Sequence, residues 1–209
     1  MSALDEALAF DEAPVELPHH ASGPRSFSWW GMVLLIATEA TLFAGLIATY
    51  FYLRFKSGPL WPPHPIEKPD MGLPLVMTAI LISSSVPVHA AESAIKKGSQ
   101  GGLRMGLALG FVLGAVFLGL TWGVEWPEKL HEFTPTTNSY GSLFFTITGF
   151  HGLHVLVGLA INAWTQVRAW KGAFDEHRHL TVQLFAMYWH FVDVVWIFVL
   201  ATIYLSPSL

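Results

Sequence analysis

Residues 141–167 read GSLFFTITGFHGLHVLVGLAINAWTQV, a run of 27 residues without Asp, Glu, Lys or Arg. A helix needs about 20 predominantly apolar residues to cross the roughly 30 Å of hydrocarbon in a bilayer. Apolar and polar residues do not alternate along this run as they do in the strands of a membrane β-barrel. The stretch therefore predicts a transmembrane α-helix.

Four further stretches have the same character. Together they predict five spans, at about 28–53, 71–91, 105–124, 141–167 and 180–205. Of the 11 basic and 15 acidic residues, only Glu39 and Asp193 lie inside a span. We therefore expect an all-α, polytopic membrane protein, with a five-helix transmembrane bundle over residues 28–205.

The composition supports a membrane protein and excludes several other classes. Of the 209 residues, 53% are hydrophobic and 12% are charged, whereas soluble domains have about 25% charged residues. Because the chain has no cysteine, it has no disulfide framework, thiolate metal site or thiol nucleophile. A net charge of −4 argues against nucleic-acid binding, which requires a basic face.

The segments outside the spans predict an orientation. Residues 1–27 are acidic and lack the basic region and apolar core of a signal peptide, so we expect a flexible tail. The tail and the second and fourth connections carry seven Lys and Arg residues, and the other three segments carry four. Since cytoplasmic loops are enriched in Lys and Arg, we expect the N-terminus in the cytoplasm and the C-terminus outside.

Ionisable side chains inside the expected spans require an explanation; they are Glu39, His151, His154, His190 and Asp193. A carboxylate at the centre of a membrane helix costs on the order of 2.5–3.5 kcal/mol on insertion scales. Each pair, His151 with His154 and His190 with Asp193, has a three-residue spacing that places both side chains on one helix face. From the residues alone, a proton-handling or cofactor site and inter-helix hydrogen bonds that fix the packing both remain open.

Haem binding is a further alternative. Membrane cytochromes hold haem between axial His ligands on neighbouring helices, and His89, His154 and His190 are candidates for that role. A free-standing electron carrier would then be the function.

Glycines recur every four residues in the third span, at Gly106, Gly110 and Gly114, and Gly119 and Gly123 follow. A stripe of small residues allows two helix backbones to approach closely. We expect this face to pack closely against a neighbouring helix, although glycine is also common in membrane helices in general.

Two longer motifs resemble a known family. Residues 148–155 (TGFHGLHV) and 188–196 (YWHFVDVVW) are similar to the signatures of subunit III of haem–copper terminal oxidases. The resemblance continues in order through residues 39–45 (EATLFAG), 125–126 (EW) and 140–145 (YGSLFF). It covers about residues 28–205 and fits the five-helix bacterial form, because longer members have two additional helices at the start.

The resemblance implies an aerobic respiratory complex that oxidises cytochrome c, reduces O2 to water and pumps protons. This chain would be its non-catalytic subunit III, without haem, copper or another metal, in the bacterial cytoplasmic membrane. It would stabilise subunit I, support proton uptake and bind phospholipid. Oxidase subunits I and II are the implied partners, with a small subunit IV and a respiratory supercomplex as further candidates. Subunit III of a quinol oxidase and a subunit associated with nitric oxide reductase remain alternatives.

The resemblance and the side-chain chemistry together give the candidate sites. Glu39 resembles the family's buried, protonated carboxylate, and we expect an inter-helix polar network of Glu125, His151, His154, His190 and Asp193. The fourth connection contains Asp175, Glu176, His177 and His179, which are either a proton-collecting surface, since His titrates near neutral pH, or a solvated charged turn. We expect Arg168 to extend to an anionic lipid headgroup.

Overall fold

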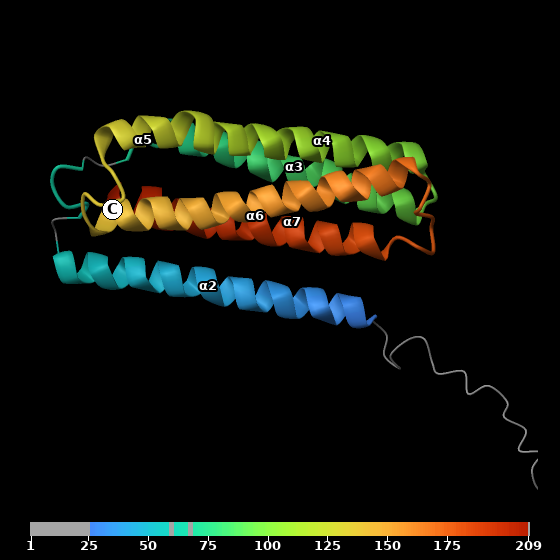
Figure 1. Cartoon of the computed structure of the whole chain (residues 1–209), viewed down its shortest axis with the longest axis horizontal. Helices are drawn as coiled ribbons and strands as arrows, with labels where there is room; N and C mark the ends of the chain where they lie inside the picture. Colours follow the sequence, from blue (N-terminus) through green and yellow to red (C-terminus); the bar gives the residue numbers. More distant parts are fainter. Residues whose placement is uncertain (1–25, 59–60, 67–68, 209) are drawn as a thin grey trace, which may run out of the picture.

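The computed structural model consists of long helices that run side by side (Figure 1). It describes residues 26–58, 61–66 and 69–208, so the expected acidic tail lies almost entirely outside the described residues. The long helices are α2 (Phe27–Ser57), α3 (Gly72–Lys96), α4 (Gln100–Leu120), α6 (Ser139–Trp170) and α7 (Leu180–Val199). The third helix continues through the π-helix η1 (Thr121–Glu125) into α5 (Trp126–Glu132), and the last continues through the π-helix η2 (Leu200–Leu205) into the 3-10 turn η3 (Ser206–Ser208).

The prediction of an all-α membrane protein with five spans is confirmed. In the described part of the chain, five helices are long and apolar enough to cross a bilayer. Several extend past the predicted limits; the third, for example, runs from Gln100 to Glu132. The predicted limits follow the first charged side chain, whereas a helix continues in its hydrogen-bonding pattern with charged side chains at its ends.

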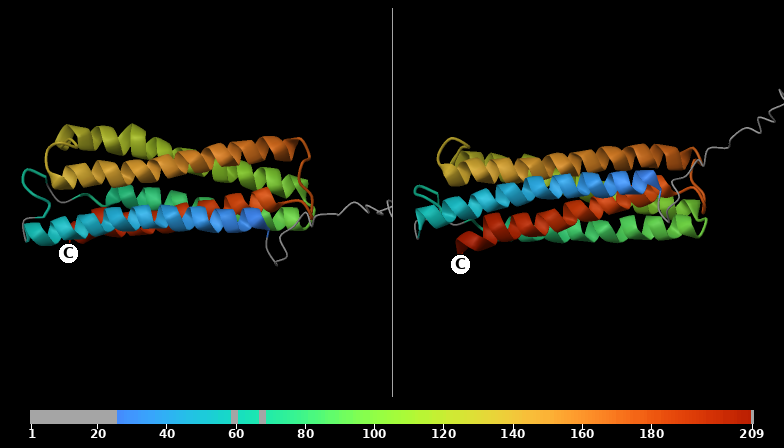
Figure 2. Two further views of the ribbon diagram at one scale, coloured as in Figure 1. Left: turned by 60° about the horizontal axis from the view of Figure 1, so that its bottom comes forward. Right: turned by 90° about the horizontal axis from the view of Figure 1, so that it is seen from below.

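Four of the helices form a bundle, and the fifth lies beside it. Helices α3, α4, α6 and α7 each pack against two of the others, in the order α3–α4–α6–α7 and back to α3. Helix α2 packs on the outside of this bundle, against α6 and α7 (Figures 1 and 2).

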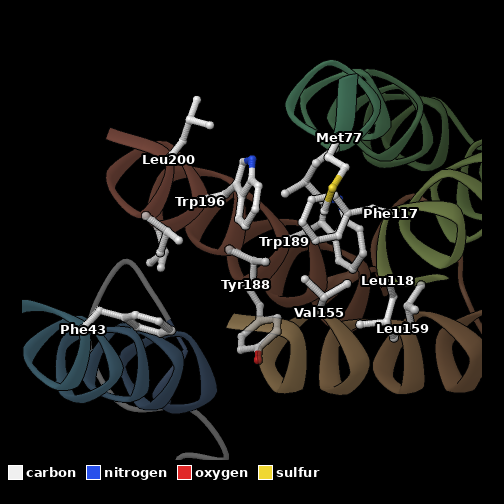
Figure 3. Close-up of a cluster of buried hydrophobic side chains, with 14 of the residues drawn as sticks. Phe43, Met77, Phe117, Leu118, Val155, Leu159, Tyr188, Trp189, Trp196 and Leu200 are labelled. Atoms are coloured by element: carbon white, nitrogen blue, oxygen red, sulfur yellow. The ribbon is translucent and has the colours of Figure 1, made fainter. Parts of the chain in front are cut away.

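Trp189 of α7 lies at the centre of the four-helix bundle and is fully buried. Its Nε1–H donates a hydrogen bond of 2.9 Å to Ser84 Oγ on α3. Its six-membered ring fills the space beside Gly114 of α4 and Gly158 of α6, where a methyl group would come within 2.6 and 2.7 Å of the ring. Figure 3 shows Trp189 together with Met77 of α3. One side chain therefore joins all four helices.

The glycine stripe explains how closely α3 and α4 approach. A methyl group on Gly106 would lie 2.5 Å from the carbonyl oxygen of Pro87, and one on Gly110 would lie 2.6 Å from Val88 Cγ2. Only glycine allows this distance between the two backbones. Gly114 instead makes room for the Trp189 ring, and Gly119 and Gly123 have open space beside them. The stripe therefore brings the two backbones together at Gly106 and Gly110, and not along its whole length.

The connections gather at two ends of the molecule. The start of α2, the turn at 97–99 and the connection 171–179 lie at one end, and the segment after α2, the connection 133–138 and the C-terminus lie at the other (Figure 1). Gly98 and Gly172 end α3 and α6 at the first end with φ values of 73° and 70°, a conformation that glycine adopts without steric cost.

Candidate functional site

Glu39 and His154 form a polar contact between α2 and α6. Glu39 Oε2 lies 3.1 Å from His154 Nε2, and the Glu39 side chain is 34% exposed. His154 Nδ1 lies 2.7 Å from the carbonyl oxygen of Phe150, which can only accept, so Nδ1 carries a hydrogen and donates. The pair then consists of either a carboxylic acid donating to a neutral imidazole or a carboxylate accepting from an imidazolium. Both forms have zero net charge, which lowers the cost of burial in a membrane.

A cavity of about 280 Å³ lies beside this pair. Its walls combine the two polar side chains with the hydrocarbon groups of both helices and with Tyr188 of α7. The Tyr188 hydroxyl donates to the carbonyl oxygen of His154 over 3.2 Å, and Phe43 of α2 packs edge-on against the imidazole. Contacts from α2, α6 and α7 thus hold His154 in place.

His151 lies on the same helix but has different partners. It is buried, and its Nε2 lies 3.2 Å from the carbonyl oxygen of Val192 on α7. The rings of Phe117 and Trp196 pack against the imidazole. His151 therefore joins α6 to α7 inside the bundle, whereas His154 joins α6 to α2 at its edge.

A third polar group joins α3 and α7. The Ser85 hydroxyl donates to Asp193 Oδ2 and lies 3.1 Å from His190 Nδ1. Since a hydroxyl has one hydrogen, it accepts from His190 Nδ1–H while it donates to Asp193. The His89 ring centre lies 6.5 Å from that of His190. The His190 side chain is 43% exposed, so this group reaches the outer surface of the bundle.

Glu125 joins the two π-helical segments. Its side chain is buried, and its Oε1 accepts a hydrogen bond from the hydroxyl of Tyr204. Glu125 belongs to η1 and Tyr204 to η2. π-helical turns are rare and often occur where function requires a side chain to be redirected, and here two of them place an acid and a phenol in contact.

The sequence matches the family model described as "Cytochrome c oxidase subunit III" over residues 12–208. The chain belongs to this family. A protein from Nocardia farcinica named "Probable cytochrome c oxidase subunit 3" is 37% identical over 83% of this chain and 85% of its own length. "Cytochrome c oxidase subunit 3" of Synechocystis is 34% identical over 98% of this chain and 86% of its own. The protein of the same name from Sus scrofa is 34% identical over 89% of this chain and 72% of its own.

The polar residues expected inside this oxidase subunit make contacts in four separate places. Glu39 contacts His154, and His151 contacts the backbone of Val192. Asp193, beside His190, accepts a hydrogen bond from Ser85, and Glu125 accepts one from Tyr204. The candidate haem ligands are also divided, because His154 faces α2 while His89 of α3 and His190 of α7 lie near each other toward the outer surface of the bundle. Within residues 26–58, 61–66 and 69–208, no three His, Cys, Asp or Glu residues are grouped as a metal site.

The connection between α6 and α7 of the subunit is a turn organised by Asp175. Asp175 Oδ1 accepts from the backbone N–H groups of His177 and Arg178, and Oδ2 accepts from Arg178 Nε at 2.8 Å. Hydrogen bonds from Arg178 lower the pKa of Asp175 to about 2. His177 Nε2 lies 3.3 Å from Glu176 Oε1, and both side chains extend into solvent. His179 forms the N-cap position of α7.

Arg168 lies at the same end, in the last turn of α6. Its guanidinium carbon lies 5.2 Å from the centre of the Phe174 ring. A cation above an aromatic face is attracted by the ring quadrupole, and the edge of the guanidinium keeps its donors available.

Several partners were not identified by the sequence interpretation. Ser85 and Tyr204 hold Asp193 and Glu125, and Thr78 on α3 accepts a hydrogen bond of 2.8 Å from Trp196 Nε1. The available signal was a group of hydroxyl residues in an otherwise apolar span, since a hydroxyl inside a membrane helix tends to bind its own backbone or a neighbouring helix.

Proposed function

We propose that this subunit III chain is an accessory subunit without a redox centre, in a proton-pumping cytochrome c oxidase of a bacterial cytoplasmic membrane. In that complex it stabilises subunit I, supports proton uptake at the cytoplasmic surface and binds phospholipid. Its relatives are named for cytochrome c oxidase, which favours cytochrome c over quinol as the electron donor of the complex.

The distribution of charge supports the orientation. Among the described residues, the end of the molecule that contains the 171–179 connection has six Lys and Arg residues: Lys96, Lys97, Arg104, Arg168, Lys171 and Arg178. The opposite end has Arg54, Lys56 and Lys129. The positive-inside rule then assigns the end with more Lys and Arg to the cytoplasm.

The partly exposed polar group on α3 and α7 supports a protein partner. Ser85, His190 and Asp193 lie within helices that cross the membrane, and His190 is 43% exposed. Polar side chains in this position are costly against lipid and generally face protein. We assign this surface to contact with subunit I.

The observation that carries the proton-uptake proposal is the exposure of His177 at the cytoplasmic end. Its side chain is 86% exposed and lies beside Glu176, so protons from the solution reach both groups. An exposed imidazole beside a carboxylate can accept a proton from solution and pass it on. The proton then passes to the uptake path of subunit I.

The test replaces His177 and His179 together with Gln in the intact oxidase. We expect turnover to fall by about tenfold at pH 9 and to change little at pH 6, because direct uptake from solution slows tenfold for each pH unit as protons become scarce. Oxygen consumption with reduced cytochrome c measures the effect.

A double variant at the opposite end is the matched control. His64 and His131 are exposed and lie beyond α2 and in α5, so His64→Gln with His131→Gln is expected to leave turnover unchanged at both pH values. Equal turnover of the His177/His179 variant and the wild type at pH 9 would exclude the proposed role of this connection.

Arg168 is the proposed contact for a phospholipid on the cytoplasmic side. It lies in the last turn of α6, where its long side chain reaches the headgroup region from a helix end. Its position above Phe174 fixes the guanidinium while leaving donors for a phosphate.

A further inference from the structure

A small hollow lies at the seam between α4 and α6. Its volume is about 270 Å³, and its walls are formed by Ala108 and Phe111 of α4 and by Asn162, Ala163, Gln166 and Val167 of α6. Because α3, α4, α6 and α7 pack as a ring, this seam lies opposite the surface of α3 and α7 that we assign to subunit I. Helix α2 packs against α6 and α7 and lies away from α4 (Figure 1). The hollow is therefore on a face of the bundle that α2 leaves uncovered.

Two amide side chains in this hollow have donors that are paired and acceptors that are not. Asn162 Nδ2 donates to the carbonyl oxygen of Leu107 over 3.2 Å, and Gln166 Nε2 donates to that of Arg104 over 3.1 Å. Both amides thus direct their nitrogen to the backbone of α4. Asn162 Oδ1 and Gln166 Oε1 are buried and accept no hydrogen bond from any residue that the structure describes. Buried polar atoms generally have a partner, and leaving one without a partner costs free energy.

Lipid does not provide the donors that these oxygens need. Gln166 lies at the level of Arg104, and Asn162 lies one helical turn, about 6 Å, deeper in the membrane-spanning part of α6. An acyl chain has no N–H or O–H group. Polar side chains within membrane helices generally face protein, and hydrogen bonds between helices satisfy them. The two oxygens therefore indicate a protein partner with two donors about one turn apart.

The side chains around the hollow are small enough for another helix to approach. Ala108 and Ala163 in its walls are exposed, and so is Ala160, one turn away on α6. Small residues allow the backbones of two membrane helices to come close together. A hydroxyl or amide side chain on an approaching helix then enters the hollow between α4 and α6.

Arg104 provides a positive charge at one end of the seam. Its Nε donates to the carbonyl oxygen of Ala169 over 3.3 Å, and its guanidinium carbon lies 4.8 Å from the centre of a Trp170 ring. None of the ion pairs among the described residues involves Arg104. Its two contacts hold the guanidinium in place and leave the terminal nitrogens available for a carboxylate.

We propose that the α4–α6 seam binds one transmembrane helix of a partner subunit, with hydroxyl or amide donors opposite Asn162 and Gln166 and an acidic side chain opposite Arg104. The two donors are one turn apart on that helix, and the acid follows about one turn beyond the donor that meets Gln166. This face is separate from the surface of α3 and α7, so the two faces bind their partners independently.

The first experiment counts the subunits of the whole oxidase, purified in mild detergent, by native mass spectrometry. Ala163→Phe fills the hollow and is expected to lose one subunit while the others stay bound. Gln166→Met keeps the size of the side chain and removes the acceptor, so we expect about a threefold loss of the same subunit, the effect of one hydrogen bond between membrane helices.

Ala90→Phe is the matched control. Ala90 is exposed on α3, about as far from the end of its helix as Ala163 is from the end of α6. The same enlargement at Ala90 is expected to retain every subunit.

A second experiment identifies the occupant of the seam by photo-cross-linking in the purified oxidase. Met105 lies on α4 one turn from Ala108 and is 66% exposed. We expect p-benzoylphenylalanine in place of Met105 to cross-link a membrane helix of a partner subunit with the proposed donors and acid. The same cross-linker in place of Ala90 is expected not to cross-link that helix.

Four outcomes would overturn the proposal. The first is a cross-link from position 105 to phospholipid or to a second copy of this chain instead of a partner subunit. The second is a full set of subunits in both Ala163→Phe and Gln166→Met, and the third is loss of the same subunit in Ala90→Phe. The fourth is equal loss of all other subunits in Gln166→Met. Because subunits are counted without measuring turnover, the result does not depend on the proposed proton uptake.

Discussion

The α3–α4 pair and helix α2 are both built from long apolar helices, but they are held in different ways. Where α3 and α4 meet, Gly106 and Gly110 bring the two backbones so close that a methyl group would collide with Pro87 or Val88. Of the 31 residues of α2, only Phe43 and Tyr50 are buried. Its attachment consists of individual side-chain contacts, such as Glu39 with His154.

The difference shows two solutions to one physical problem. Between membrane helices the hydrophobic effect contributes little, because lipid tails are as apolar as leucine, so close packing and hydrogen bonds hold helices together. The α3–α4 pair uses close packing, which requires glycine at fixed positions. Helix α2 uses a few polar and aromatic contacts, and a groove remains between it and α7.

The largest loss of stability is expected where the backbones of α3 and α4 approach most closely. Gly106→Ala places a methyl group against the carbonyl oxygen of Pro87 and against Ala91. Because backbone atoms cannot move aside as a flexible side chain can, we expect a loss of about 3 kcal/mol in the free energy of unfolding. Equilibrium unfolding in mixed detergent micelles measures it.

Gly119→Ala is the control on the same helix. Nothing lies within 4 Å of a methyl group at Gly119, so this variant is expected to be as stable as the wild type, or more stable by up to about 1 kcal/mol because Ala favours a helix over Gly. Equal losses in the two variants would mean that close approach does not hold α3 and α4 together.

The sequence was sufficient to predict the five helices and the glycine contact. Each span has almost no charged residue, and a membrane leaves a helix as the only structure that satisfies the backbone of a continuous apolar run. The four-residue spacing of Gly106, Gly110 and Gly114 in turn defines one helix face. Both signals are local, so one stretch of sequence contains all the information.

The partners of the buried polar residues could not be predicted in this way. Tyr204 is 79 residues from Glu125, and their contact depends on two π-helical turns that no spacing in the sequence indicates. His151 and His154 are about 60° apart around α6. This angle is enough to direct one side chain to α7 and the other to α2, although both belong to one motif.

A smaller loss of stability is expected from replacing Tyr50, the side chain that anchors α2. The Tyr50 hydroxyl accepts a hydrogen bond of 2.9 Å from Trp61 Nε1 and lies 2.9 Å from Ser206 Oγ. Tyr50→Phe keeps the ring and removes both bonds, so we expect a loss of about 1 kcal/mol in the free energy of unfolding. Hydrogen exchange at the C-terminal end of α2 is expected to become faster.

Tyr52→Phe separates the anchor from a general effect of removing a hydroxyl. Tyr52 lies on the same helix but is mostly exposed, and its variant is expected to match the wild type in stability and exchange. If Tyr50→Phe also matched the wild type, packing alone would hold α2, and the contrast with α3–α4 would be lost.

The smallest effect on stability is expected from replacing Asp175, which organises the solvent-exposed turn between α6 and α7. Its pKa of about 2 is below the ordinary value of 3.8, because Arg178 and backbone N–H groups bind the carboxylate. A lowered pKa in the folded state stabilises the turn above about pH 4, and this contribution is lost as the pH falls toward 2. At neutral pH the group is fully ionised in both the folded and the unfolded chain.

Asp175→Asn is expected to lower the free energy of unfolding slightly, by the contribution that the carboxylate makes above about pH 4, and to leave the pH profile of turnover unchanged between pH 6 and 9. The amide oxygen still accepts from the backbone of His177 and Arg178, and the ion pair lost with Arg178 is exposed and weak in water. Oxygen consumption across this pH range distinguishes Asp175 from the neighbouring His177 and His179. A profile that shifted in Asp175→Asn as in the double His variant would mean that the order of the turn, and not titration of its imidazoles, supports proton uptake.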